Sequence, residues 1–103
     1  MMVELKAKVW LEKDGRPVLG EGRARLLEAI DEERSILKAA ERLGMSYRHA
    51  WGIVQKINKA WGEDVVRSIR GGKEGGSTEL SGSGRALLKE YYEKIAALDR
   101  FLK

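Results

Sequence analysis

Two helical patterns joined by a glycine-containing turn constrain this chain more than any other feature. Ser35 is a residue type that caps helices, and the apolar residues after it recur at three- and four-residue steps. They are Ile36, Ala39, Ala40 and Leu43. Gly44 stands where a helix end favours a left-handed residue, and Ser46 can cap the next helix. Residues 35–61 therefore predict a helix-turn-helix.

The second of these helices, expected over residues 46–61, has two unlike sides. One side is apolar and consists of Tyr47, Ala50, Val54, Ile57 and Trp61. The opposite side is polar and basic, with His49 and Lys56 on one flank and Trp51 and Asn58 on the other. Its members are Arg48, Gly52, Gln55 and Lys59. We expect Trp51 to be a core residue, whereas Tyr47 could either pack or make an external contact.

The positive charge is concentrated in about a quarter of the sequence. The 103 residues include 20 Lys and Arg and 16 Asp and Glu, which gives a net charge of +4. Residues 46–73 hold six basic and two acidic residues, so this segment carries the whole excess. A polyanion is the natural partner of such a segment.

The N-terminal part predicts a hairpin followed by a helix. Apolar and polar residues alternate over residues 5–12, which is typical of a half-buried strand. Asp14 and Gly15 suit a tight turn, and residues 17–19 supply a short return strand. Residues 21–31 have helical spacing and complete a three-helix core.

The C-terminal part predicts a second hairpin and a long helix. Residues 65–80 form two short strand patterns around a glycine-rich loop, an arrangement called a wing. Ser81 can cap a last helix within residues 82–102. With 43% hydrophobic residues, the chain can bury one core. The expected fold class is α+β and mostly helical: a single winged-helix domain over residues 1–103, with its three-helix core at residues 21–62.

Composition argues against several classes of function. The chain has no cysteine and one histidine, His49, so disulfides, thiolate metal sites and a histidine-based catalytic dyad are not expected. Neither paired carboxylates nor a nucleophile with a base is apparent, so we expect neither an enzyme nor a cofactor. No apolar run approaches the roughly 18 residues that span a bilayer. With no signal-peptide pattern, we expect a cytoplasmic protein without a membrane partner.

Three stretches carry a resemblance to a known family: SILKAA at 35–40, LGMSYRHAW at 43–51 and RGGKEGG at 70–76. Over about residues 5–92 the chain resembles the N-terminal DNA-binding domain of ModE-type molybdate-responsive transcription regulators, relatives of the LysR-type winged helix. The resemblance implies a homodimer with the last helix and the first strand in its interface. It also implies that the third helix enters the major groove and that the wing contacts the flanking backbone.

The chain departs from the family pattern in two ways. Full-length members have C-terminal oxyanion-binding domains, whereas this sequence ends at Lys103, so no molybdate site is expected in this chain. The wing has Glu74 where the family usually has glycine, and Ser81-Gly82 replaces a usual Thr-Pro. Because a carboxylate repels phosphate, the wing is expected to sit differently or to contribute less.

The predicted function is that of a sequence-specific transcription regulator that binds double-stranded DNA as a homodimer. The predicted DNA contacts are Ser46, Tyr47, Arg48, His49, Gln55, Lys56, Lys59, Arg67, Arg70 and Lys73. Arg48 can take the two acceptors of guanine and Gln55 can pair with adenine, while Lys side chains neutralise phosphates.

The predicted dimer interface combines an exposed tryptophan of the first strand with a long apolar stripe on the last helix. Its residues are Trp10, Leu88, Tyr91, Ile95, Leu98 and Leu102. Two alternatives stay open. The winged helix could serve protein interaction or assembly without meeting DNA, in which case the wing arginines would only protect strand edges. The basic face could instead bind RNA.

Overall fold

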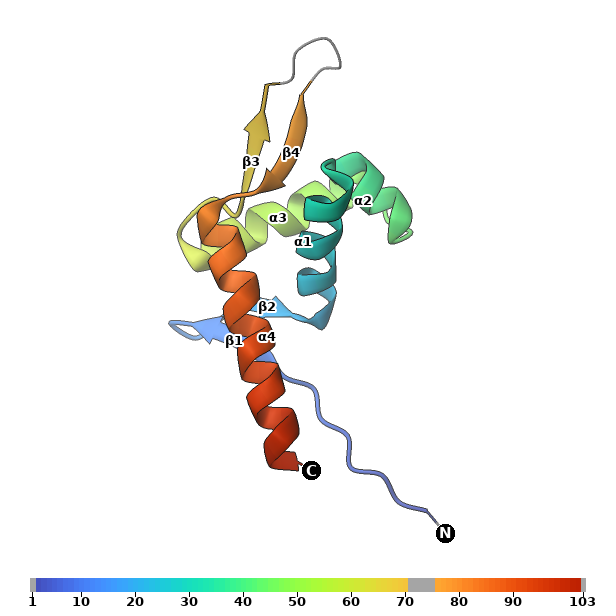
Figure 1. Cartoon of the computed structure of the whole chain (residues 1–103), viewed down its shortest axis with the longest axis vertical. Helices are drawn as coiled ribbons and strands as arrows, with labels where there is room; N and C mark the ends of the chain where they lie inside the picture. The colour runs from blue at the N-terminus through green and yellow to red at the C-terminus, as the bar shows by residue number, and fades with distance from the viewer. Residues whose placement is uncertain (1, 71–75, 103) are drawn as a thin grey trace.

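The described part of the chain forms four helices and two hairpins, and the order of the elements follows the chain (Figure 1). The computed structural model describes residues 2–70 and 76–102. The elements are β1 (Trp10–Lys13), β2 (Arg16–Gly20), α1 (Glu21–Glu33), α2 (Ile36–Arg42), α3 (Tyr47–Trp61), β3 (Val66–Ile69), β4 (Ser77–Leu80) and α4 (Gly82–Leu102). The expected class, a mostly helical α+β winged helix, is confirmed.

The helix-turn-helix forms through the caps that the sequence predicted. Ser35 Oγ accepts a hydrogen bond from the backbone N–H of Lys38 at 3.0 Å, which caps α2. Ser46 Oγ accepts one from the N–H of His49 at 3.1 Å, which caps α3. Gly44 has a φ of 72°, the left-handed conformation that glycine adopts without steric cost. These local bonds fix the turn between α2 and α3.

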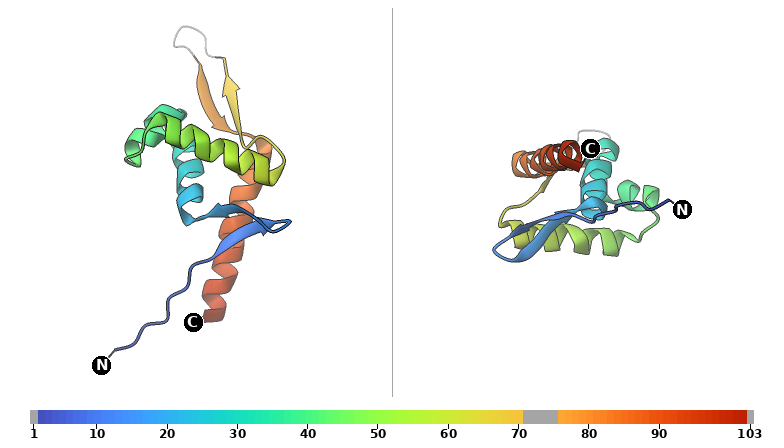
Figure 2. Two further views of the ribbon diagram at one scale, coloured as in Figure 1. Left: turned by 180° about the vertical axis from the view of Figure 1, so that it is seen from behind. Right: turned by 90° about the horizontal axis from the view of Figure 1, so that it is seen from below.

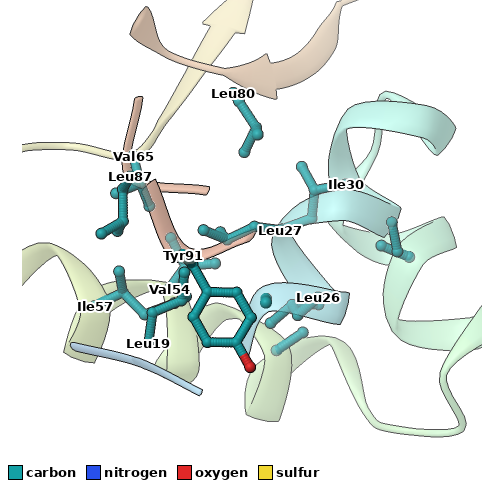
Figure 3. Close-up of a cluster of buried hydrophobic side chains, with 14 of the residues drawn as sticks. Leu19, Leu26, Leu27, Ile30, Val54, Ile57, Val65, Leu80, Leu87 and Tyr91 are labelled. Atoms are coloured by element: carbon teal, nitrogen blue, oxygen red, sulfur yellow. The ribbon is translucent and has the colours of Figure 1, made fainter. Parts of the chain in front are cut away.

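One hydrophobic core joins the helices to both hairpins (Figure 3). It draws Leu19 from β2, Leu27 from α1, Ile57 from α3 and Leu80 from β4, and all four side chains are essentially buried. Small buried alanines, Ala39 and Ala40 of α2 and Ala50 of α3, occupy the same core. Their size suits the steep crossing of two helices.

The predicted first strand is wrong over its N-terminal half. It was expected from Leu5, but β1 begins at Trp10, and Leu5 is 84% exposed. The reason is the length of the partner strand. Trp10 pairs with Gly20, the last residue of β2, and α1 begins at the next position. Residues 2–9 therefore have no strand to pair with in the part of the chain that the structure describes.

The wing joins α4 through a close contact. Strands β3 and β4 pair antiparallel, with Val66 opposite Leu80 and Ile69 opposite Ser77. Ser81 Oγ accepts a hydrogen bond from the N–H of Gly84 at 3.0 Å, so the predicted cap forms. A Cβ at Gly84 would overlap the backbone carbonyl of Val65, so only glycine lets α4 pack this closely.

Seen from below, α3 runs along one side of the molecule, while α4 and α1 lie side by side on the other (Figure 2, right). The start of α4 meets the end of α3, where Trp61 donates a hydrogen bond to Ser83. The wing projects from one end, and both chain ends lie at the other (Figure 1). The first half of α4 packs on the core, while its last turns extend past the β1–β2 hairpin. None of the helices within residues 2–70 and 76–102 combines the length and apolarity that a membrane span requires.

Candidate nucleic-acid interface

The outer face of α3 carries basic side chains that are free to meet a ligand. Arg48, Lys56 and Lys59 are all exposed, as is Gln55. Within the described ranges, none of the three cations forms an ion pair or a hydrogen bond. Their charges are therefore not neutralised by the protein, and the face is a cationic surface available to a polyanion.

The start of α3 contributes two of the predicted contacts in a different way. Ser46 is exposed, but its hydroxyl accepts the capping hydrogen bond. His49 is exposed, and its backbone N–H makes that bond. The remaining N–H groups of the first turn point along the helix axis, where the dipole favours an anion.

Two aromatic side chains of α3 stand outside the core, contrary to part of the expectation. Trp51 was expected to pack inside, yet it is 47% exposed, and Tyr47 is 48% exposed. They lie four residues apart, on adjacent turns of one flank of α3. Trp51 was missed as a candidate contact residue. Its flank position on the helical wheel was the available signal, and the general preference of tryptophan for burial outweighed it.

The inner side of α3 is tied to its surroundings by hydrogen bonds. Asn58 Oδ1 accepts from the N–H of Val65 at 2.8 Å, and the Trp61 indole donates to Ser83 Oγ at 2.7 Å. Lys13 donates to the Trp61 carbonyl at 2.6 Å and lies 5.2 Å from the centre of its ring. These contacts fix α3 relative to the wing and α4, so Asn58 and Trp61 have structural roles.

The predicted wing contact Arg67 is engaged within the protein. Its guanidinium donates to Glu79 of β4, with Nε at 2.8 Å from Oε1. Glu79 is buried, and its other oxygen lies 3.5 Å from Arg34 and 3.7 Å from Arg85. Arg85 also donates to Asp31 at 2.7 Å. The base of the wing is thus a cluster of three arginines and two carboxylates.

Glu79 is a residue that the sequence reasoning missed. It lies directly opposite Arg67 in the β3–β4 register, and opposite charges at facing positions attract. The facing positions of Arg67 and Glu79 in the hairpin register were the signal that could have indicated this ion pair. Glu79 neutralises part of the charge of Arg67. Arg70 is therefore the wing cation with more of its charge available to an external anion. Arg70 is exposed and has no ion pair among the described residues, while Lys73 and Glu74 lie outside them.

The predicted interface residues differ in how much surface they expose. Trp10 is 50% exposed, and its indole donates to Glu12 at 2.7 Å. Leu88, Ile95 and Leu98 are each partly exposed. Tyr91 is only 5% exposed, because its ring packs in the core of this chain, so it offers little surface to a second copy. The side chain of Leu102 is not among those described.

A hollow of about 1200 Å³ lies between the N-terminal segment, the start of α1 and α4. Its lining includes Val9, Trp10, Tyr92 and Ile95. Tyr92 donates to Glu28 at 2.6 Å, and burial together with this bond raises the pKa of Tyr92 to about 12. At neutral pH its hydroxyl is therefore protonated. Across the described ranges, no group of three or more potential ligands could hold a metal ion.

No protein-family model matches the chain. The chain is 38% identical over 98 residues to the molybdenum transport protein ModE of Azotobacter vinelandii. It is 37% identical over 98 residues to the molybdenum-pterin-binding protein MopA of Rhodobacter capsulatus. These matches cover 91% and 95% of this chain but 36% and 37% of the two relatives, so the chain spans little more than a third of their length.

A shorter match of 69 residues, at 36% identity, is to the transcriptional regulator ModE of Haemophilus influenzae; it covers 67% of this chain and 27% of that protein. Among solved structures, complexes of the BenM DNA-binding domain with catB and benA site 1 DNA each give a TM-score of 0.58 at 18% identity. They cover 79% of this chain and 84% and 88% of those chains, so the fold is shared. The chain is therefore similar over most of its length to part of the ModE and MopA proteins, and it has a winged-helix fold.

Proposed function

We propose that this chain is the DNA-binding part of a transcription regulator, equivalent to the N-terminal domain of ModE-type proteins. The observation that carries the proposal is the outer face of α3, where Arg48, Lys56 and Lys59 are exposed and unpaired within the described ranges. The relatives named as transcriptional regulators support it, as do neighbours solved with DNA. In this proposal α3 lies in the major groove, the wing contacts the flanking backbone, and the protein acts in the cytoplasm.

The proposal is tested first by a mobility-shift titration on random-sequence duplex DNA at low salt. Four cations have no partner among the described residues, those of α3 and Arg70, and they predict that log affinity falls with log salt with a slope near −4 per protomer. Failure to bind in the micromolar range would contradict DNA binding and favour a protein-interaction module. Competition by single-stranded RNA stronger than competition by the duplex would favour RNA.

Removing Arg70 is expected to reduce the salt dependence more than removing Arg67. Arg70→Ala deletes a cation that has no partner among residues 2–70 and 76–102, so the slope should become shallower by about one. Arg67→Ala is the matched variant in the same wing, but Glu79 already neutralises part of the charge of Arg67. Its slope should change by less than half as much. Equal changes for the two variants would show that the Glu79 pairing does not matter for DNA.

A homodimer is the second part of the proposal, and exposed apolar surface supports it. Residues 2–9 have no partner strand in the described chain, and Leu5 and Trp10 are exposed. The last turns of α4 extend past the hairpin beside them (Figure 1). A second copy that pairs through these segments would leave both α3 helices outward, on the side opposite α4. Two such helices about 34 Å apart would meet successive turns of a two-fold-related site.

If the protein is a dimer, two charge insertions on α4 should change its dissociation constant to different extents. Leu98→Glu places a carboxylate in the apolar stripe and should raise the dimer dissociation constant by at least ~10-fold. Ala96→Glu introduces the same charge on the other side of the helix, at an exposed position, and should change it little. Sedimentation equilibrium gives the answer, since the monomer has a mass of 11.6 kDa. A wild-type protein that sediments as a monomer would contradict this part.

A further inference from the structure

Gly52 occupies the middle of α3 although the fold gives no reason for a glycine there. It lies within the helix, on the polar outer side between Arg48 and Lys56. A glycine inside a helix lowers the ratio of folded to unfolded protein by about five-fold relative to alanine.

Among the described residues, none imposes a constraint that requires glycine at position 52. Its φ is not positive, unlike that of Gly44 or Gly62. A Cβ at Gly52 would have no heavy atom within 4 Å, whereas a Cβ at Gly84 would overlap Val65. The described protein thus has room for a side chain at this position, and the missing side chain leaves space for a close approach by a partner.

The surface around Gly52 is a hollow of about 320 Å³. The helix presents Arg48 one turn before Gly52 and Lys56 one turn after it, so the three form one row along α3. Both cations line the hollow, with His49 and Ile53 on one side. Within the residues described, neither cation is paired with another group.

We propose that Gly52 is the point where DNA comes closest to α3, and that the hollow receives the edge of a base pair. This inference rests on the proposed function, because it places α3 in the major groove. The N-terminal half of such a helix contacts base edges, and Gly52 lies in that half of α3. With no Cβ at Gly52, α3 can lie deeper there. The Arg48 and Lys56 side chains then flank the base pair, and guanine O6 and N7 are the acceptors that fit them.

The Gly52→Ala variant tests this inference because its two expected effects have opposite signs. The added methyl group should stabilise the helix, raising the ratio of folded to unfolded protein by about five-fold in urea titrations. It should also weaken binding to a duplex that the wild-type protein selects from a random pool, by at least ~10-fold. Binding to a shuffled duplex of the same composition should change by less than about two-fold.

Gly82→Ala is the matched control. Gly82 begins α4 and does not belong to the outer face of α3, and a Cβ there also meets nothing within 4 Å. This variant should bind both duplexes as the wild type does. If Gly52→Ala binds the selected duplex as tightly as the wild type, the close approach is overturned while DNA binding stands. Equal losses on both duplexes overturn the base-edge assignment. A wild type that binds neither duplex overturns the proposed function and this inference together.

Discussion

The Gly84→Ala variant is expected to lose about 3 kcal/mol of unfolding free energy, which is typical of a side chain forced into a packed contact. Its Cβ would overlap the carbonyl oxygen of Val65 and crowd the Val65 Cα. Because these are backbone atoms, no side-chain rotation relieves the contact. Either α4 or the segment at Val65, just before β3, must move. Urea unfolding followed by circular dichroism measures the change in midpoint and slope.

Gly82→Ala, two residues earlier in the same helix, is the control for this prediction as well. A Cβ at Gly82 has open space, so its stability should stay within about 0.5 kcal/mol of the wild type. A Gly84→Ala protein as stable as the Gly82→Ala protein would show that α4 does not pack against Val65 as described. The contact between Gly84 and Val65 matters for function because Val65 precedes β3, the first strand of the wing.

Replacement of Arg48 by alanine is expected to have the largest effect on DNA recognition among the α3 cations. Arg48 lies in the first turns of α3, where a helix in the major groove contacts base edges, and it has no protein partner within the described residues. Losing an arginine that pairs with guanine should cost about 1–3 kcal/mol on the selected duplex. The loss on a shuffled duplex should be smaller, because only phosphate attraction is removed there.

Lys89→Ala separates a base contact from a general charge effect. It removes one positive charge from α4, where Lys89 pairs only weakly with Glu93 at 3.8 Å. This variant should bind both duplexes nearly as the wild type does. Equal losses for Arg48→Ala on the selected and shuffled duplexes would make Arg48 a phosphate contact instead.

Features that depend on neighbours in the sequence were predictable. The caps at Ser35, Ser46 and Ser81 and the left-handed Gly44 formed as expected, because each involves residues only a few positions apart. The helical periodicity likewise located α3 together with its buried side. The outer face of α3 followed from the same periodicity, so Arg48, Gln55 and Lys59 are exposed as drawn on the helical wheel.

Features that depend on distant partners were not predictable in the same way. Alternation over residues 5–9 indicated a strand, but a strand needs a partner, and β2 ends opposite Trp10. Arg67 seemed free until the register placed Glu79 across from it. The burial of two aromatic residues was predicted wrongly for a related reason: Trp51 was expected in the core, and Tyr91 was expected on the dimer surface. Burial is set by which elements pack against each face, so Tyr91 entered the core while Trp51 stayed outside.

The most direct test of the account is the ratio of affinities for two duplexes of identical composition. One is a sequence that the wild-type protein enriches from a random pool, and the other is its shuffled version. A regulator that reads bases with α3 should bind the first at least ~10³-fold more tightly at physiological salt, and the enriched sequence should be two-fold symmetric. A ratio near one, or no enriched sequence, would contradict the claim that α3 reads DNA.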